Sequence, residues 1–109
     1  MADGAEAIDQ VLHAVQDPTR RRLLELLRSG EHSVRELTDA LPVTQSAVSQ
    51  HLKVLRDADL VQVRPDGTRR LYAITPDGLG PVRAWVDSFW DDALSAFAEH
   101  AERQRGSTR

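Results

Sequence analysis

Residues 44–56 read Thr44-Gln45-Ser46-Ala47-Val48-Ser49-Gln50-His51-Leu52-Lys53-Val54-Leu55-Arg56, and they begin with a residue type that caps helices. On a helical period of about 3.6 residues, the apolar side chains fall on one face. The opposite face gathers uncharged donors and acceptors with one lysine: Gln45, Ser46, Ser49, Gln50 and Lys53. This pattern predicts a helix over residues 45–57 whose polar edge suits the DNA major groove, where glutamine pairs with adenine. An ordinary solvated surface helix is the alternative.

A shorter helix is predicted immediately before this segment. Ser33-Val34-Arg35-Glu36 has the form of a capping box, in which serine and glutamate each bind a free backbone N–H at the helix start. The helix runs from Val34 to Ala40 and must end before Pro42, because the residue before a proline is disfavoured in helical conformation. Two short helices joined by a turn of about four residues form a helix-turn-helix unit.

Two further helices precede this unit, and a hairpin follows it. Periodic apolar residues predict a helix over residues 5–15, and the capping residue Asp17 starts a second one over residues 18–28. Alternating segments flank the turn-forming Pro65-Asp66-Gly67, which predicts a two-stranded hairpin with a basic tip. The expected strands cover residues 60–63 and 71–74.

A long final helix is predicted from Leu79 to Ala101, where apolar residues recur at helical spacing. Its apolar stripe is too wide for one side of a monomer of this size, so we expect part of it to meet another subunit. The predicted fold class is mainly α with a small β-hairpin (α+β): a dimeric winged helix-turn-helix in the order ααααββα. We expect residues 1–103 to form one domain for DNA binding and dimerisation, and residues 104–109 to form a flexible tail.

Composition limits the class of protein. The 109 residues suffice for one domain with its own core, and the sequence contains no cysteine. The absence of thiols excludes a disulfide framework and sulfur-based metal sites. No apolar run is long enough to span a bilayer, and the N-terminus is acidic where a secretory signal would be basic. We therefore expect a cytoplasmic protein with no membrane partner.

The net charge of −3 hides an alternation of basic and acidic blocks. Residues 18–28 contain four arginines and one glutamate, and residues 61–75 contain three arginines and one aspartate. Residues 76–102 contain six acidic side chains and one arginine. DNA responds to the field of the face that it meets rather than to the total charge, so this distribution is compatible with a basic DNA-binding face.

Four motifs, taken in their order and spacing, resemble the ArsR family of winged-helix repressors. They are Asp17-Pro18-Thr19-Arg20-Arg21, the segment at residues 44–56, Leu55-Arg56-Asp57-Ala58-Asp59-Leu60-Val61 and Gly67-Thr68-Arg69-Arg70-Leu71-Tyr72. The resemblance covers about residues 8–100. One departure is Asp59, where the family usually carries glycine, but aspartate tolerates the left-handed conformation better than most residues.

The resemblance implies a homodimeric repressor of transcription that binds a palindromic site on double-stranded DNA. The 45–57 helices would enter successive major grooves, and the 64–70 wings would lie on the backbone or in the minor groove. The predicted DNA-binding residues are Thr44, Gln45, Ser46, Ser49, Gln50, His51, Lys53, Arg64, Thr68, Arg69, Arg70 and Arg20. The predicted dimer interface, on the first and last helices, comprises Ile8, Leu12, Val82, Trp85, Val86, Phe89, Trp90, Ala93 and Phe97. A surface salt bridge is the alternative role for Arg20.

Metal and effector sites are open alternatives. The final helix carries Asp87, Asp91, Glu99 and His100, but their spacing does not match the zinc-type site that the resemblance would place there. A pairing of His13 with His100 of a partner subunit, completed by nearby carboxylates, is the other metal hypothesis, and we predict neither a metal nor a cofactor. The aromatic residues of the final helix could line a pocket for an apolar effector of unknown identity, although packing is their favoured role. A repressor without an effector is equally compatible.

Two other classes of function compete with DNA binding. The sequence contains no Gly-x-Ser-x-Gly elbow, no phosphate-binding glycine loop and no His-Glu-x-x-His motif, so we predict that the protein is not an enzyme. A protein-binding module could use the same 45–57 helix for a protein partner. The arginines of the wing and the uncharged polar edge of the helix favour DNA.

Overall fold

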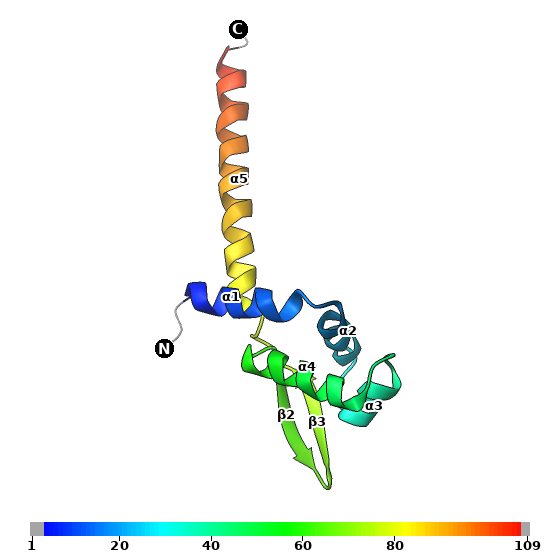
Figure 1. Ribbon diagram of the computed structural model, residues 1–109. Coiled ribbons are helices and arrows are strands. Elements are labelled where there is room, and N and C mark those ends of the chain that lie inside the picture. Colours follow the sequence, from blue (N-terminus) through cyan, green and yellow to red (C-terminus); the bar gives the residue numbers. More distant parts are fainter. Residues whose placement is uncertain (1–3, 108–109) are drawn as a thin grey trace.

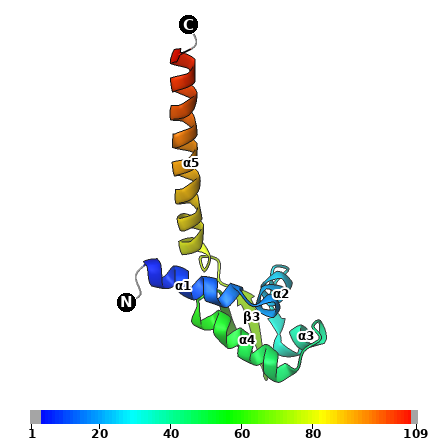
Figure 2. The same ribbon diagram turned by 45° about the horizontal axis from the view of Figure 1, so that its top comes forward.

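One long helix projects from a body of four helices and a small sheet in the computed structural model, which describes residues 4–107 (Figure 1). The elements are α1 (Gly4–Val15), α2 (Pro18–Leu27), β1 (His32–Ser33), α3 (Val34–Asp39), α4 (Gln45–Asp57), β2 (Val61–Asp66), β3 (Arg69–Ile74) and α5 (Gly80–Ser107). The molecule measures 74 Å along its longest axis and 32 and 21 Å along the other two. α1 lies at the foot of α5 in both views (Figure 2), and the two helices are in contact.

Capping residues start α2 and α3 as the sequence predicts. The carboxylate of Asp17 accepts hydrogen bonds from the backbone N–H groups of Thr19 at 2.8 Å and Arg20 at 3.2 Å. Ser33 and Glu36 form the complete capping box, with bonds of 2.9 and 3.2 Å. The backbone N–H of Arg20 is the main cause that lowers the pKa of Asp17, and that of Ser33 lowers the pKa of Glu36.

The helix-turn-helix unit has the predicted limits to within one residue. α3 ends at Asp39, one residue before the expected end, and α4 covers residues 45–57 as expected. Asp59 follows α4 with a φ of 60°, so the residue that replaces the family's usual glycine does adopt the left-handed conformation.

The sheet has three strands, in the order β1-β3-β2, rather than the two that the sequence predicts. β1 pairs antiparallel with β3 through His32 opposite Tyr72 and Ser33 opposite Leu71. A strand of two residues shows no alternation, so its sequence carries no signal for the pairing. β2 and β3 are also longer than predicted, because their charged ends pair across the hairpin up to Asp66 opposite Arg69.

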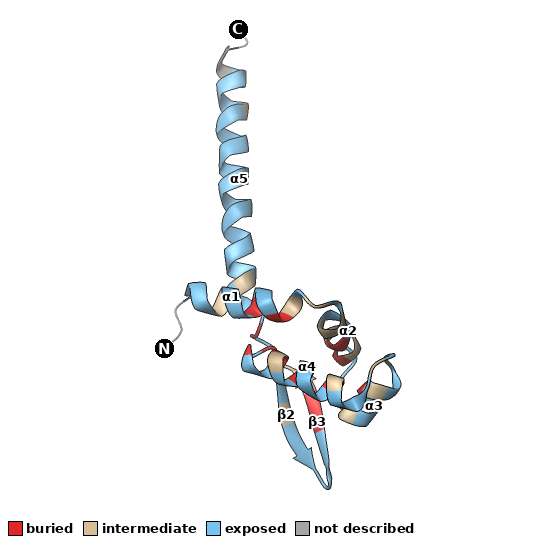
Figure 3. Cartoon of the chain, viewed as in Figure 1, coloured by how far each residue is buried: buried red, intermediate tan, exposed pale blue. Residues whose placement is uncertain are grey.

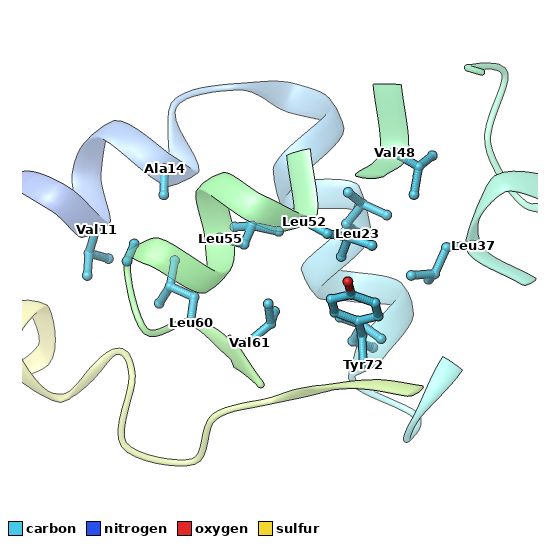
Figure 4. Close-up of a cluster of buried hydrophobic side chains, with 12 residues drawn as sticks. Val11, Ala14, Leu23, Leu37, Val48, Leu52, Leu55, Leu60, Val61 and Tyr72 are labelled. Carbon is cyan, nitrogen blue, oxygen red and sulfur yellow. The ribbon is translucent and has the colours of Figure 1, made fainter. Parts of the chain in front are cut away.

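The core lies between α1, α2, α3, α4 and the sheet (Figure 4). Its largest fully buried side chains are Leu23, Leu37, Val48, Leu52, Leu55 and Leu60. Figure 4 shows Tyr72 of β3 beneath Leu23, so that the strand closes the cluster from below. Burial of one leucine stabilises the fold by about 1.5–3 kcal/mol. Three of these side chains belong to α4, which fixes the orientation of that helix and turns its polar edge outward.

α5 packs against the body only near its N-terminal end and is exposed along nearly its whole length (Figure 3). Val82 packs against the core, whereas residues 83–100 are all exposed. The helix continues to Ser107, six residues past the predicted end at Ala101, so residues 104–107 of the expected tail are helical, and residues 108 and 109 lie outside the described part. Glutamate, glutamine and arginine are strong helix formers, which explains the continuation. In residues 4–107, no helix has the length and apolar character needed to cross a membrane.

Candidate nucleic-acid interface

α4 presents a polar edge on the side opposite its buried residues. Gln45, Ser46, Ser49 and Gln50 are all exposed, as the helical period predicts. Thr44 is committed to the helix start, where its hydroxyl accepts from the backbone N–H of Ala47 at 3.1 Å. The edge therefore presents amide and hydroxyl groups that form no side-chain hydrogen bond within residues 4–107, so these groups can bond to base edges.

Lys53 extends the same edge by one helical turn. Its Nζ lies 3.8 Å from Oδ2 of Asp57, and both side chains are mostly exposed. An exposed pair of this kind contributes little to stability, typically below about 1 kcal/mol. Lys53 can therefore exchange its carboxylate for a phosphate or a base without loss of the fold.

The wing places three arginines at or near its tip, but they differ in their partners. The tip is the two-residue loop Gly67-Thr68, in which Gly67 takes a φ of 63° that favours glycine. Arg69 bonds Asp66 across the loop at 2.9 Å. Arg64 binds Glu31 at 2.6 Å, whereas Arg70 is exposed and forms no ion pair within the described residues.

An open groove of about 710 Å³ separates the wing from α3 and the start of α4. Four of the predicted DNA-binding residues line it, from two different elements: Gln45, Thr68, Arg69 and Arg70. Arg35 of α3 lies in the same groove and is a candidate that the sequence analysis missed. Its place inside the capping box indicated exposure but not which face it shares with the wing. Glu36 and Asp39 also line the groove and limit its positive charge.

Arg20 and His51 differ from the other predicted DNA contacts because both are half-buried. The guanidinium of Arg20 points back toward the end of α1 and also reaches the ring of His51. A cation engaged in this way is not free for phosphate in this structure. The sequence analysis predicted a DNA contact or a surface salt bridge for Arg20, and it gave no sign of this internal role.

The predicted dimer residues form an uncovered apolar surface on α5 and the adjoining side of α1. Phe97 is 71% exposed, Trp90 is 64% exposed and Phe89 is 58% exposed. Trp85 packs edge to face on Phe89 at 5.1 Å between ring centroids. Leu12, Val86 and Ala93 are also exposed, and Ile8 and Val82 are half-buried. Large aromatic surfaces of this extent on a small protein typically mark a contact with another chain.

The candidate metal ligands are not assembled within one chain. Among the described residues, no three histidine, aspartate or glutamate side chains lie close enough together to hold a metal ion. His13 is on α1 and His100 is on the far half of α5.

Comparison with known proteins gives consistent relatives. The family model described as bacterial regulatory protein, arsR family, matches residues 17–63. The HTH-type transcriptional regulator Rv2034 of Mycobacterium tuberculosis is 45% identical over 100 residues, which cover 92% of this chain and 94% of the relative. The transcriptional repressor SdpR of Bacillus subtilis is 26% identical over 82 residues, covering 75% and 91%.

Solved structures agree with these relatives. The crystal structure of the ArsR family transcriptional regulator RHA00566 superposes with a TM-score of 0.78 at 27% identity, and the match covers 87% of this chain and 98% of that one. The family model, the relatives and the solved structure therefore all describe regulatory proteins. With a relative 45% identical over nearly all of both chains, this protein belongs to the ArsR family of bacterial regulatory proteins, which are DNA-binding transcriptional regulators and not enzymes.

Proposed function

We propose that the protein is a repressor that binds a palindromic operator as a homodimer. α4 lies in the major groove, and the wing at residues 64–70 lies on the backbone or in the minor groove. The observation that carries the proposal is the free polar edge of α4 beside the arginines of the wing, across the groove that Gln45 and Arg70 share. The buried face of α4 and Tyr72 of β3 belong to the same core, so the core sets the distance between these two surfaces.

The proposed contacts divide into two kinds. Gln45, Ser46, Ser49 and Gln50 read base edges, since their amide and hydroxyl groups match the donors and acceptors of the major groove. Lys53, Thr68 and the arginines of the wing bind phosphate or a narrow minor groove, which positions the protein without reading sequence directly. Thr44 contributes through the capped start of α4, where the N–H groups at a helix N-terminus favour a phosphate.

The homodimer is proposed from α5 and α1. A single copy leaves Trp85, Phe89, Trp90 and Phe97 in water, and a two-fold related copy would cover the same side chains on both subunits at once. Such a dimer presents two α4 helices to one face of the DNA. Two-fold symmetry then requires a palindromic site with half-sites about one helical turn apart, roughly 34 Å.

Repression is the proposed outcome of binding, and the cytoplasm, where bacterial DNA lies, is the proposed location. The relative SdpR is named a transcriptional repressor, which supports the sign of regulation for this chain. A dimer seated on a promoter blocks polymerase by occupying the same DNA, and no effector is needed for that step.

The test is a selection of bound fragments from the genomic DNA of the source organism, combined with a mass measurement of the protein by light scattering. We expect a dimer and an enriched palindrome with half-sites about one helical turn apart. Transcription in vitro from a promoter that carries the selected site should then fall as protein is added. A monomer without salt-sensitive affinity for any duplex would refute the proposal, and a rise in transcription would refute repression alone.

A further inference from the structure

Three helices meet at the side chain of Arg20. Its Nε donates to the backbone oxygen of Ala14 at 2.6 Å, and one terminal nitrogen donates to that of His13 at 3.2 Å. The other terminal nitrogen lies 3.3 Å from Nδ1 of His51. Arg20 itself is in the first turn of α2, so one guanidinium joins the end of α1, the start of α2 and the middle of α4.

The contact with α1 has a clear structural reason. The last carbonyl groups of a helix have no partner within the helix, and a cation near that end is favoured by the helix dipole. Arg20 satisfies two of these carbonyl groups, those of His13 and Ala14. Ala14 is fully buried and belongs to the core, so its carbonyl group needs a hydrogen-bond partner from the protein.

The contact with α4 determines which nitrogen of the His51 ring carries the proton. A guanidinium has only donors, so Nδ1 of His51 must accept, and the neutral ring then carries its proton on Nε2. The imidazole is therefore held in one tautomer, with Nε2–H left as a donor. His51 lies next to Gln50, which belongs to the polar edge of α4.

We propose that Arg20 is a positioning residue for DNA binding: it ties α1 to His51 and thereby sets the angle at which α4 meets the duplex. This inference rests on the proposed function, since it requires α4 to enter the major groove. α1 belongs to the proposed dimer surface, so the three bonds of Arg20 connect that surface directly to α4. A planar fork with several donors can make this link, and the single ammonium group of a lysine cannot.

Arg21 offers a matched control on the same helix. One of its terminal nitrogens donates to the backbone oxygen of Val15 at 2.7 Å, so it also binds the end of α1. None of its interactions within the described residues reaches α4. Arg20→Lys and Arg21→Lys therefore both keep the charge and both weaken the capping of α1, but only the first breaks the link to His51.

The experiment compares both variants with the wild type on two probes: the duplex most enriched by the wild-type protein from a random pool, and a duplex of scrambled sequence. Affinities are measured over a series of KCl concentrations. We expect Arg20→Lys to lose roughly tenfold in affinity for the enriched duplex, with little change on the scrambled one and an unchanged salt slope. Arg21→Lys should stay within about twofold of the wild type on both duplexes.

A mutant cycle with His51→Ala separates positioning from loss of fold. If Arg20 acts through His51, Arg20→Lys should cost no further discrimination in the His51→Ala protein. The ¹⁵N NMR spectrum of the wild-type ring gives an independent readout, and it should show the proton on Nε2. Circular dichroism and light scattering check that each variant remains a folded dimer.

Several outcomes would overturn the inference. They are wild-type discrimination by Arg20→Lys, additive losses in the cycle, a proton on Nδ1 of His51, or equal losses for Arg20→Lys and Arg21→Lys. A salt slope that falls in Arg20→Gln by about 0.9 per contact and is restored in Arg20→Lys would mean a phosphate contact instead. A wild-type protein that prefers no duplex would refute the proposed function and this inference together, whereas the other outcomes refute the inference alone.

Discussion

Glu31 holds Arg64 by both of its carboxylate oxygens, at 2.6 Å to Nε and 3.0 Å to a terminal nitrogen. Glu31 directly precedes β1 and Arg64 lies in β2, so the pair reaches across the central strand β3 and fastens the wing to the body. The hydrogen bond with Arg64 is the main cause that lowers the pKa of Glu31. The charge of Arg64 is thus neutralised within the protein, while Arg70 remains available.

This difference predicts unequal effects of two arginines on DNA binding. Arg70→Gln should lower the slope of log affinity against log salt by about 0.9 for each phosphate contact that is lost. Arg64→Gln should change the slope less, because Glu31 already balances its charge. Titration of a labelled scrambled duplex by fluorescence anisotropy over a series of KCl concentrations measures both slopes. Equal changes would show that Glu31 releases Arg64 when DNA binds.

Acid should destabilise the fold through three carboxyl groups, those of Asp17, Glu31 and Glu36. Their pKa values are lowered from ordinary values of 3.8, 4.5 and 4.5. Each group binds fewer protons in the folded chain than in the unfolded chain, so its contribution is complete above the ordinary value and is lost as the pH falls through the lowered pKa. Urea unfolding from about pH 7 to about pH 3 measures the free energy of unfolding.

Glu31→Gln is the control for this pH dependence. The variant lacks one of the three titrating groups, so its free energy of unfolding should lie below that of the wild type near neutral pH. The two curves should converge in acid, where Glu31 is protonated in the wild type. A difference that stays constant over the whole range would contradict the role of the ion pair.

Gln50 should contribute to sequence discrimination rather than to general affinity. If its amide contacts a base edge, Gln50→Ala should reduce the preference for the selected operator over a scrambled duplex by about 1–3 kcal/mol. Gln16→Ala is the matched control, because Gln16 is an exposed glutamine outside α4 and the wing. Competition binding with both duplexes gives the preference. An equal loss of affinity on both duplexes would show that Gln50 contacts the DNA backbone rather than a base edge.

The apolar face of α5 should control association. Trp90→Glu places a charge in the proposed interface and should weaken the dimer by about 2 kcal/mol or more, since buried aromatic residues dominate such contacts. Ser95→Glu adds the same charge to the same helix, but five residues farther along and thus on a different face. Sedimentation equilibrium measures the dissociation constant. The proposed interface fails if Ser95→Glu dissociates the dimer and Trp90→Glu does not.

Gly78 should be intolerant of even one added carbon. A Cβ at this position would lie 2.4 Å from the backbone oxygen of Asp59 and 3.1 Å from Cα of Leu60, and neither backbone atom can move freely. Gly78→Ala should therefore destabilise the fold by about 1–3 kcal/mol. Gly80→Ala is the control, because nothing lies within 4 Å of its added carbon. Urea unfolding decides, and equal stability of the two variants would contradict the close approach.

The helices of this protein could be predicted from its sequence because their signals are local. Asp17, the Ser33–Glu36 capping box and Thr44 each bind a backbone N–H two or three residues away, so residue types at fixed spacing are enough to mark a helix start. The polar edge of α4 and the apolar stripe of α5 follow from the helical period in the same way.

The partners of the arginines and the third strand were decided by tertiary structure alone. Arg20 meets His51 and Arg64 meets Glu31 across 31 and 33 residues of sequence, and β1 pairs with β3 over a similar separation. No periodicity or capping motif links residues so far apart, because packing of the core brings them together. The sequence therefore determined which residues are basic and where the helices begin. Only the packed chain decided that Arg20 and Arg64 bind other groups of the protein, whereas Arg70 forms no ion pair within the described residues.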